Sequence, residues 1–267
     1  MLWSSRDAGA AMTAAKLLSL PVIIVITYGA LIAAYFGSSL IVIGLNRMQG
    51  ARKIQARSEA PEQIRRDFRQ SFRSLALIAV WFGGGYWAYA RMGWGLRAAN
   101  PSLLSVALSF VVSMLLFDTW FYWLHRLIHS RWLFRRVHLW HHRTTAPEVW
   151  SNNSDLLLDT LVLQSYWLAA HFLIPIAPMV LAAHKLYDQF TGAMGHSGFE
   201  HAGRIAWPPS PILSVTHHDQ HHRYSSCNYA THFSLWDRLL GTLHPTHDDE
   251  VKRNLSPQPL APRVAPK

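Results

Sequence analysis

Eight of the sixteen histidines in this 267-residue chain fall into three short boxes, HRLIH, HLWHH and HDQHH. The boxes contain His125, His129, His138, His141, His142, His218, His221 and His222. Their spacings of three and four residues place imidazoles on one face of a helix. Imidazole is the commonest metal ligand in proteins, so each box can present two or more ligands to an ion from one rigid element.

The number of these histidines predicts two metal ions. A tetrahedral zinc site takes four protein ligands, and a catalytic one takes three and a water. The eight box histidines, with His196 in the segment GHSGFE as a ninth, exceed what one ion can bind. The single cysteine, Cys227, excludes a Cys-based zinc finger, an iron–sulfur cluster and an internal disulfide framework.

Four long apolar runs must position the boxes. The runs cover residues 17–45, 75–90, 101–124 and 156–187. The first exceeds the roughly 20 residues that a helix needs to cross the hydrocarbon core. The fourth contains Pro175 and Pro178, which leaves open a helical hairpin or one span with a re-entrant segment. We therefore predict an all-α, multi-pass integral membrane protein with about four transmembrane helices and a helical cap that holds a dimetal site.

The distribution of basic residues predicts the orientation. Of the 25 Lys and Arg residues, eight lie in segment 46–74, five in 125–155 and seven beyond residue 190. The positive-inside rule places these three segments, and with them every histidine box, in the cytoplasm. Because topology accounts for most of the net charge of +10, no nucleic-acid partner is expected.

Segment 64–75 carries an amphipathic pattern within the first basic stretch. Ile64, Phe68, Phe72 and Leu75 fall on one helical face beside several arginines. The pattern predicts a helix that lies on anionic lipid, and a solvated linker helix is the alternative.

The order of the motifs resembles the fatty acid hydroxylase superfamily, which contains sterol desaturases, sterol C4-methyl oxidases and hydroxylases of sphingolipids, fatty acids and carotenoids. The matching motifs are FDTWFYWLHRLIH, HLWHH, HSGFE and HHDQHH, followed by NYATHFSLWDRLLGT. Ala230 departs from the pattern, since glycine is usual there. The resemblance covers roughly residues 100–245 and implies a di-iron site that uses O₂ to hydroxylate or desaturate an unactivated C–H bond of a lipid.

The resemblance also implies the metal ligands. These are His125, His129, His138, His141, His142, His196, His218, His221 and His222. His184 and His217 are candidates for a tenth ligand, because Gly192 stands where some hydroxylases carry another histidine. The cofactors are then two iron ions, with zinc expected in some preparations, and O₂ is the cosubstrate. Two electrons must come from an external protein of the cytochrome b5, ferredoxin or reductase type.

Asp118 lies seven residues before His125, on the same face of the predicted helix. An ionisable residue inside a span is costly and usually functional or paired. We predict that Asp118 accepts a hydrogen bond from the second N–H of a ligand imidazole. Asp219 and Asp237 could serve in the same way, and Asp237 is equally plausible as a structural partner.

The remaining expectations concern domains, location and alternatives. We expect an N-terminal membrane region with a cytoplasmic amphipathic loop (1–99), a catalytic domain (100–248) and a Pro-rich disordered tail (249–267). The ending lacks a dilysine or KDEL-type signal, which favours a bacterial inner membrane over the endoplasmic reticulum. A zinc hydrolase at the membrane interface is one alternative, although HExxH is missing and no box contains Glu. A non-catalytic metal-binding protein, such as a metal or haem transporter, is the other.

Histidines outside the boxes are expected to be structural. His171 is predicted to be packed within its span. The expected surface residues are His201, His232, His244 and His247. Gly83, Gly84 and Gly85 are expected to allow close helix packing, because no strand precedes them as a dinucleotide-binding motif would require.

Overall fold

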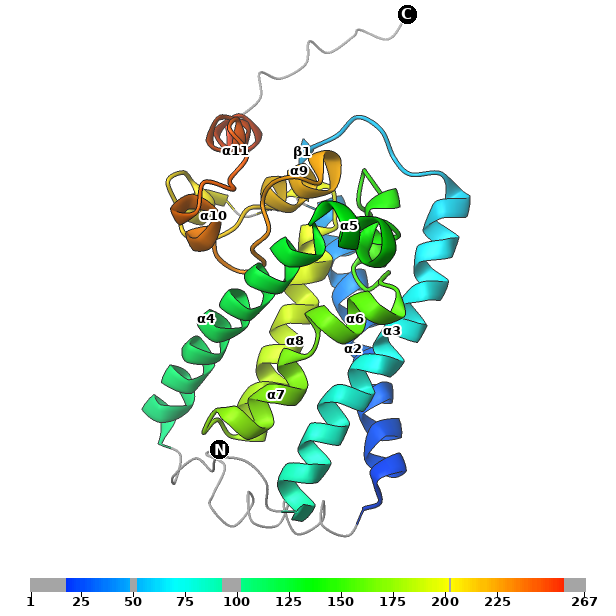
Figure 1. Cartoon of the computed structure of the whole chain (residues 1–267). Coiled ribbons are helices and arrows are strands. Elements are labelled where there is room, and N and C mark those ends of the chain that lie inside the picture. The colour runs from blue at the N-terminus through cyan, green and yellow to red at the C-terminus, as the bar shows by residue number, and fades with distance from the viewer. Residues whose placement is uncertain (1–17, 49–51, 93–101, 202, 257–267) are drawn as a thin grey trace, which may run out of the picture.

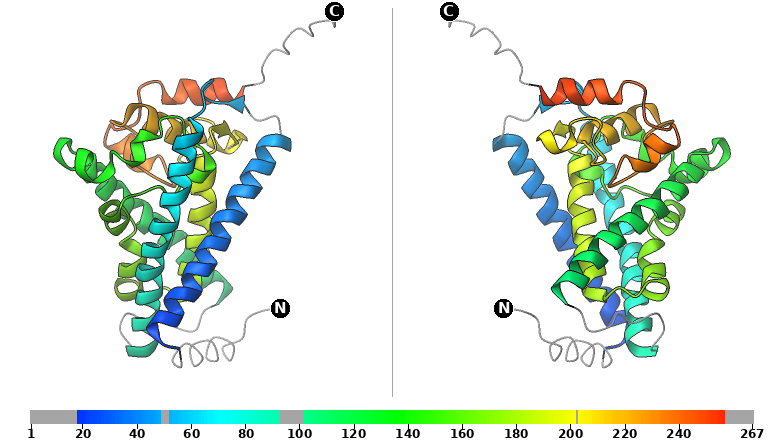
Figure 2. Two further views of the ribbon diagram at one scale, coloured as in Figure 1. Left: turned by 90° about the vertical axis from the view of Figure 1, so that its right-hand side faces the viewer. Right: turned by 90° about the vertical axis from the view of Figure 1, so that its left-hand side faces the viewer.

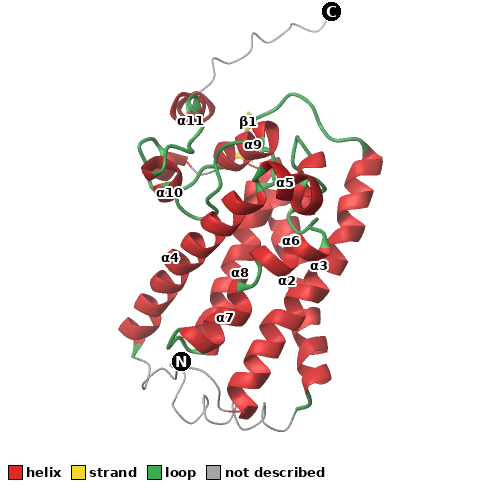
Figure 3. Ribbon diagram, in the orientation of Figure 1, coloured by secondary structure: helices red, strands yellow, loops and turns green. Residues whose placement is uncertain are grey.

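The computed structural model describes residues 18–48, 52–92, 102–201 and 203–256, and nearly all of their regular structure is helical (Figure 3). This confirms the predicted all-α class. A small sheet pairs β1 (Arg52–Lys53) with β2 (Phe199–Glu200) in antiparallel register, Arg52 opposite Glu200. The pair joins the segment after the first long helix to the segment that follows His196.

Four long helices form the bundle (Figures 1 and 2). They are α2 (Leu20–Met48), α3 (Pro61–Trp87), α4 (Leu103–Ile128) and α8 (Pro178–Gly195). Within the described ranges, α2 and α4 are the helices long and apolar enough to cross a membrane. Ser102 caps α4, since its side chain accepts a hydrogen bond from the Ser105 N–H at 3.1 Å.

The fourth apolar run forms more than one helix. It contains α6 (Leu157–Leu163), α7 (Tyr166–Leu173) and the first part of α8. Pro178 occupies the first turn of α8, where its missing N–H is not needed. In Figure 1, α6 and α7 lead away from the cap and α8 returns to it, so the run is a helical hairpin rather than one span.

The amphipathic segment 64–75 is the first half of α3, which continues without a break into the second apolar run and ends in a π-helical turn, Ala88–Met92. Its apolar face packs against aromatic side chains of the protein. The Phe68 ring centroid lies 6.0 Å from that of Phe36 on α2 and 5.7 Å from that of Trp150. The solvated-linker prediction is therefore wrong, because this half of α3 packs against α2. Ile64, Phe68 and Phe72 are only partly buried, and the lipid-surface helix stays a prediction.

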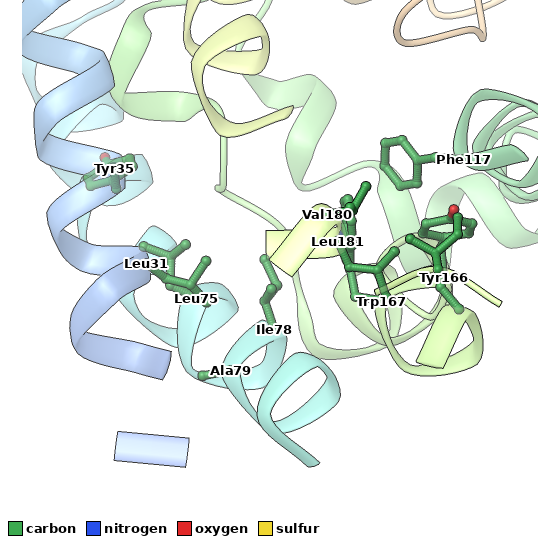
Figure 4. Close-up of a cluster of buried hydrophobic side chains, with 12 residues drawn as sticks. Leu31, Tyr35, Leu75, Ile78, Ala79, Phe117, Tyr166, Trp167, Val180 and Leu181 are labelled. Carbon is green, nitrogen blue, oxygen red and sulfur yellow. The ribbon is translucent and has the colours of Figure 1, made fainter. Parts of the chain in front are cut away.

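The centre of the bundle is a continuous apolar core (Figure 4). Buried members include Leu31, Tyr35, Leu75, Ile78, Phe117, Tyr166, Trp167 and Leu181. Two glycines allow the helices to approach closely. A Cβ on Gly83 would lie 3.0 Å from Thr27 Oγ1, and one on Gly85 would lie 2.8 Å from His171 Nδ1. The predicted packing role is confirmed for Gly83 and Gly85 but is wrong for Gly84, where a Cβ would meet nothing within 4 Å. The buried position of His171 is also confirmed.

Short helices form a cap at one end of the bundle (Figure 2). The cap contains α5 (Arg131–Leu133), a π-helical turn (Phe134–His138), 3-10 turns at His141–Arg143, Val149–Ser151 and Gly203–Ala206, α9 (Val215–Tyr224), α10 (Leu235–Leu239) and α11 (His247–Leu255). These elements carry six of the nine predicted ligands. The other three, His125, His129 and His196, lie at the adjoining ends of α4 and α8.

Candidate metal centre

Nine histidines converge where the bundle meets the cap, and they form two groups. The five-histidine group is His125, His129, His138, His142 and His221. The four-histidine group is His141, His196, His218 and His222. Within each group, one ring nitrogen of every histidine lies within 4.8 Å of one from every other member. These are the nine residues that the sequence predicted as ligands.

Two of the boxes are divided between the groups. On α9, His218 and His222 are four residues apart and face the four-histidine group, whereas His221 points to the other. In HLWHH, the chain passes from a π-helical turn to a 3-10 turn, so His138 and His142 share a group and His141 does not. Each group therefore draws its members from several elements, and the folded chain assembles it.

Hydrogen bonds fix the tautomers of the five-histidine group. Three of its Nδ1 atoms lie 2.8 Å from backbone carbonyl oxygens, which only accept. The pairs are His125 with Tyr229, His129 with Ser225, and His221 with Cys227. Since Nδ1 must donate in each pair, the neutral ring keeps its lone pair on Nε2. The Nε2 atoms of His129 and His221 are buried and have no hydrogen-bond partner.

Two carboxylates that the sequence analysis missed lie against the groups. Asp159 Oδ2 accepts a hydrogen bond from His138 Nδ1 at 2.7 Å. Asp155 Oδ1 lies 3.0 Å from His141 Nδ1, without the alignment of a hydrogen bond. Carboxylates in this position orient a metal-bound imidazole and raise its basicity. The available signal was a pair of acidic residues at the start of an otherwise apolar run.

The nitrogen positions fit bound metal ions. His125 Nε2 and His138 Nε2 are 3.1 Å apart, and both Nδ1 atoms are already engaged by acceptors. Two lone pairs at this distance repel each other unless a cation lies between them. Ligands about 2.1 Å from one ion and at right angles would be about 3.0 Å apart. Neither group includes a carboxylate, and an all-imidazole set suits Fe, Zn, Cu or Ni.

The four-histidine group repeats this arrangement. His218 Nε2 lies 3.1 Å from both His196 Nε2 and His222 Nε2. His222 Nδ1 lies 2.7 Å from the Thr144 carbonyl oxygen, and His196 Nδ1 lies 2.9 Å from that of Gly192. The two groups are adjacent, because the rings of His142 and His222 stack with centroids 4.9 Å apart.

Burial favours the neutral form of six imidazoles in these groups. Desolvation, followed by the neighbouring imidazoles, lowers the pKa of His196 to about 3. Desolvation also lowers the pKa of His221 to about 3, although its bond to the Cys227 carbonyl opposes the shift. The pKa values of His138, His142, His218 and His222 are lowered from the usual range for the same main reason. The neutral form is the one that binds metal.

A cavity of about 440 Å³ reaches both groups. His141, His196 and His218 line it from the four-histidine group, and His125 and His138 from the other. From there it extends along α8. Its size lies within the range of about 300–1,000 Å³ that is typical of small-molecule sites.

The prediction for Asp118 is wrong. Its Oδ1 accepts hydrogen bonds from three backbone N–H groups instead of an imidazole. The donors are Thr231, His232 and Phe233, at 3.0, 2.7 and 3.3 Å. Seven residues correspond to about 10 Å along a helix, so Asp118 lies level with the loop before α10 and not with the boxes. It fixes that loop.

His184 and His217, the candidates for a tenth ligand, lie outside both groups. His184 Nδ1 is 2.8 Å from Ser113 Oγ, and His217 Nε2 is 3.0 Å from Asp237 Oδ2. Both predictions are therefore wrong, because neither ring contributes a nitrogen to either group.

The other two carboxylates considered in the sequence analysis, Asp237 and Asp219, stabilise the fold through hydrogen bonds. Asp237 accepts hydrogen bonds from the backbone N–H groups of Tyr229 and Ala230, and so positions the carbonyl that binds His125. This is the structural role considered for it. Asp219 accepts a hydrogen bond from Gln55 Nε2 at 2.9 Å and not from an imidazole.

Two histidines expected at the surface are buried. His232 Nε2 lies 3.3 Å from His184 Nε2, and His247 Nδ1 lies 3.0 Å from Gln220 Oε1. Neither lies in a helical box, so no spacing signal indicated burial. His201 and His244 are partly exposed.

The fold and the site together define a class of protein. It is a mostly helical protein with two adjacent all-imidazole groups beside a cavity. The family model described as fatty acid hydroxylase matches residues 110–242, and through this segment the chain belongs to the fatty acid hydroxylase family. The matched segment contains all nine histidines of the two groups.

Three curated relatives illustrate the range of the family. A cholesterol 25-hydroxylase-like protein of Danio rerio is 28% identical over 154 residues, which cover 55% of this chain and 60% of the relative. Methylsterol monooxygenase erg25A of Aspergillus fumigatus is 32% identical over 162 residues, 57% of this chain and 52% of the relative. Very-long-chain aldehyde decarbonylase GL1-9 of Oryza sativa subsp. indica is 32% identical over 157 residues, which cover 55% of this chain and 58% of the relative. The chain thus spans about half to three fifths of these relatives, and no solved structure matches it.

Proposed function

We propose that this protein is a membrane-bound, O₂-dependent di-iron oxygenase that hydroxylates or desaturates an unactivated C–H bond of a lipid. One observation carries the proposal. Nine imidazoles, seven of them buried and two partly buried, bring ring nitrogens together in two adjacent groups, beside a cavity large enough for a small molecule. The relatives named as a hydroxylase and a monooxygenase support oxidative chemistry. The hydrolase and transporter alternatives gain no comparable support.

The nine histidines are the proposed ligands, with one iron in each group. Iron supplies the activation of O₂, with two electrons from an external electron-transfer protein. The protein's own residues prepare the site. Carbonyl oxygens and Asp159 hold the Nδ1 protons of four members of the five-histidine group, so that their Nε2 atoms are available. The cavity holds the lipid against both groups and limits the access of water.

We propose that the protein crosses the membrane through α2, α4, the apolar half of α3 and the hairpin of α6 to α8. Exposed apolar side chains along α2 and α4, such as Val25, Leu40 and Leu103, support contact with lipid. The basic residues near the cap favour a cytoplasmic metal centre. Location in a bacterial inner membrane stays a prediction. The sterol-related names of two relatives favour a sterol or a similar lipid as substrate.

Comparative lipid profiling tests the activity. Cells that express the protein should accumulate a lipid that has gained one oxygen atom or lost two hydrogen atoms relative to control cells, and this product should require O₂. The His141→Ala variant should insert into the membrane and form no product, whereas His244→Ala, outside both groups, should behave like the wild type. Product formation by His141→Ala would contradict the proposed centre.

A further inference from the structure

An ion pair that the metal centre does not use lies buried on α8. Lys185 Nζ donates hydrogen bonds to Asp188 Oδ2 at 2.7 Å and to Gln164 Oε1 at 3.1 Å. The two charged side chains are only 4% and 13% exposed. Burying such a pair costs free energy that a pair of apolar residues would not, so it is not explained by stability. In a helix that enters the membrane, an ionisable pair indicates a functional site.

The pair and the metal centre share one cavity. Lys185, Asp188 and Gln164 line the same cavity as His141 and His196. Lys185, Asp188, Gly192 and His196 follow at spacings of three and four residues, which is one face of α8. With a rise of about 1.5 Å per residue, Lys185 and His196 are separated by about 16 Å along the helix. The cavity is therefore long, with an ion pair toward one end and imidazoles at the other.

The pair retains capacity to bind a ligand. An ammonium group has three N–H donors, and Asp188 and Gln164 occupy two of those of Lys185. The third has no hydrogen-bond acceptor within the described part of the chain. On Asp188, Oδ1 lies 3.9 Å from His232 Nε2, beyond hydrogen-bond distance, and can accept from another donor.

The charge of the cavity determines the kind of group that fits. Lys185 is the one Lys or Arg among the residues that line it, and Asp155 and Asp188 also line it. Because Asp188 neutralises Lys185, a carboxylate or phosphate head would enter a cavity without excess positive charge. A hydroxyl group can accept from the ammonium and donate to the carboxylate at once.

We propose that Lys185 and Asp188 bind the hydroxyl group of a neutral lipid substrate and so determine which carbon reaches the metal centre. The inference rests on the proposed function, since it identifies the end of the substrate opposite the oxidised carbon. The lipid class is a long neutral molecule with a terminal hydroxyl, and its reacting carbon lies on the order of 16 Å from that hydroxyl.

Binding of three probes that differ only in the head group tests this assignment. Octadecan-1-ol, octadecanoic acid and octadecane are each equilibrated with the full-length protein in nanodiscs, and bound probe is measured by mass spectrometry. The wild type should bind the alcohol about tenfold or more tightly than the alkane, as expected for hydrogen bonds to charged groups, and more tightly than the acid. Equal affinity for alcohol and alkane, or preference for the acid, would overturn the proposal.

Variants of the pair give the decisive comparison. The double variant Lys185→Met/Asp188→Leu removes both charges and keeps the volume, a change that proteins often tolerate. It should lose the preference for the alcohol. The surface pair Lys252 and Asp249, with the same three-residue spacing, provides the matched control Lys252→Met/Asp249→Leu, which should keep it. An unchanged preference in the cavity variant would refute the assignment.

A single substitution gives a second readout that only folded protein can produce. Asp188→Asn leaves Lys185 without its counter-charge, so the affinity for the acid relative to the alcohol should rise about tenfold or more. An unchanged ratio would contradict the proposal. Metal content measured in the same samples separates the two hypotheses. A wild type that holds two metal ions but shows no alcohol preference refutes the head-group site alone, whereas absence of metal refutes the proposed oxygenase.

Discussion

The two histidine groups differ in enclosure. In the five-histidine group, every Nδ1 has a hydrogen-bond partner, and two of the five side chains line the cavity. In the four-histidine group, three of the four side chains line the cavity, and no partner holds His218 Nδ1 among the described hydrogen bonds. The four-histidine group also offers one ligand fewer to an ion. From this difference we expect the five-histidine group to hold its proposed ion more firmly, and the four-histidine group to be more open to the proposed substrate.

Neighbouring residues on α9 allow the largest test of this comparison. His221→Ala removes a ligand from the five-histidine group, and His222→Ala removes one from the four-histidine group. Mutation of a residue that only hydrogen-bonds to a metal ligand typically lowers metal affinity or activity by about 10–100-fold. Loss of a ligand itself should therefore lower product formation by about 100-fold or more in both variants. Each variant should also fall from two bound metal ions per chain toward one, measured by mass spectrometry of the purified protein. Loss of both ions from either variant would show that the groups are not separate sites.

Acidification should release the metal at a pH below the ordinary histidine pKa of about 6.5. Burial lowers the pKa of His196 and His221 to about 3 in the folded protein, so protons compete poorly with metal until the pH is well below 6.5. In the unfolded chain the same residues protonate near 6.5. Folded metal-free protein should therefore lose stability as the pH falls from 6.5 toward 3. Metal release with a midpoint at or above pH 6.5 would contradict the burial of these groups.

The carboxylates should give smaller and unequal effects. Asp159→Asn removes the acceptor of the His138 Nδ1 proton and should weaken metal binding in the five-histidine group by about 10–100-fold. Asp155→Asn should cost less than tenfold, because Asp155 lies 3.0 Å from His141 without hydrogen-bond alignment. Metal titration of both proteins measures the difference. A larger loss of metal affinity in Asp155→Asn than in Asp159→Asn would contradict the expectation that the five-histidine group holds its metal more firmly.

Much of the site could be predicted from sequence, because helical spacing and the family resemblance both depend on the histidines themselves. The division into two groups could not. It depends on how the segments that carry the boxes pack against one another, since the same division also occurs within the regular helix α9. The carbonyl acceptors near Ser225 and Tyr229 were also hidden, since every residue has a carbonyl group.

The errors in the fold have equally local causes. An apolar helix face indicates burial but does not distinguish lipid from protein, so the sequence alone does not reveal that segment 64–75 packs on α2. Asp118 was placed on the correct helix face. However, backbone N–H groups of the loop 231–233 donate hydrogen bonds to the Asp118 carboxylate. No sequence pattern within α4 predicts that this distant loop packs there.

Metal content of the full-length protein, purified without a histidine tag and analysed by mass spectrometry, tests the central claim most directly. The account predicts two iron ions per chain, both lost in a variant that combines His221→Ala with His222→Ala. Stoichiometric zinc without iron, together with product formation in the absence of O₂, would contradict it.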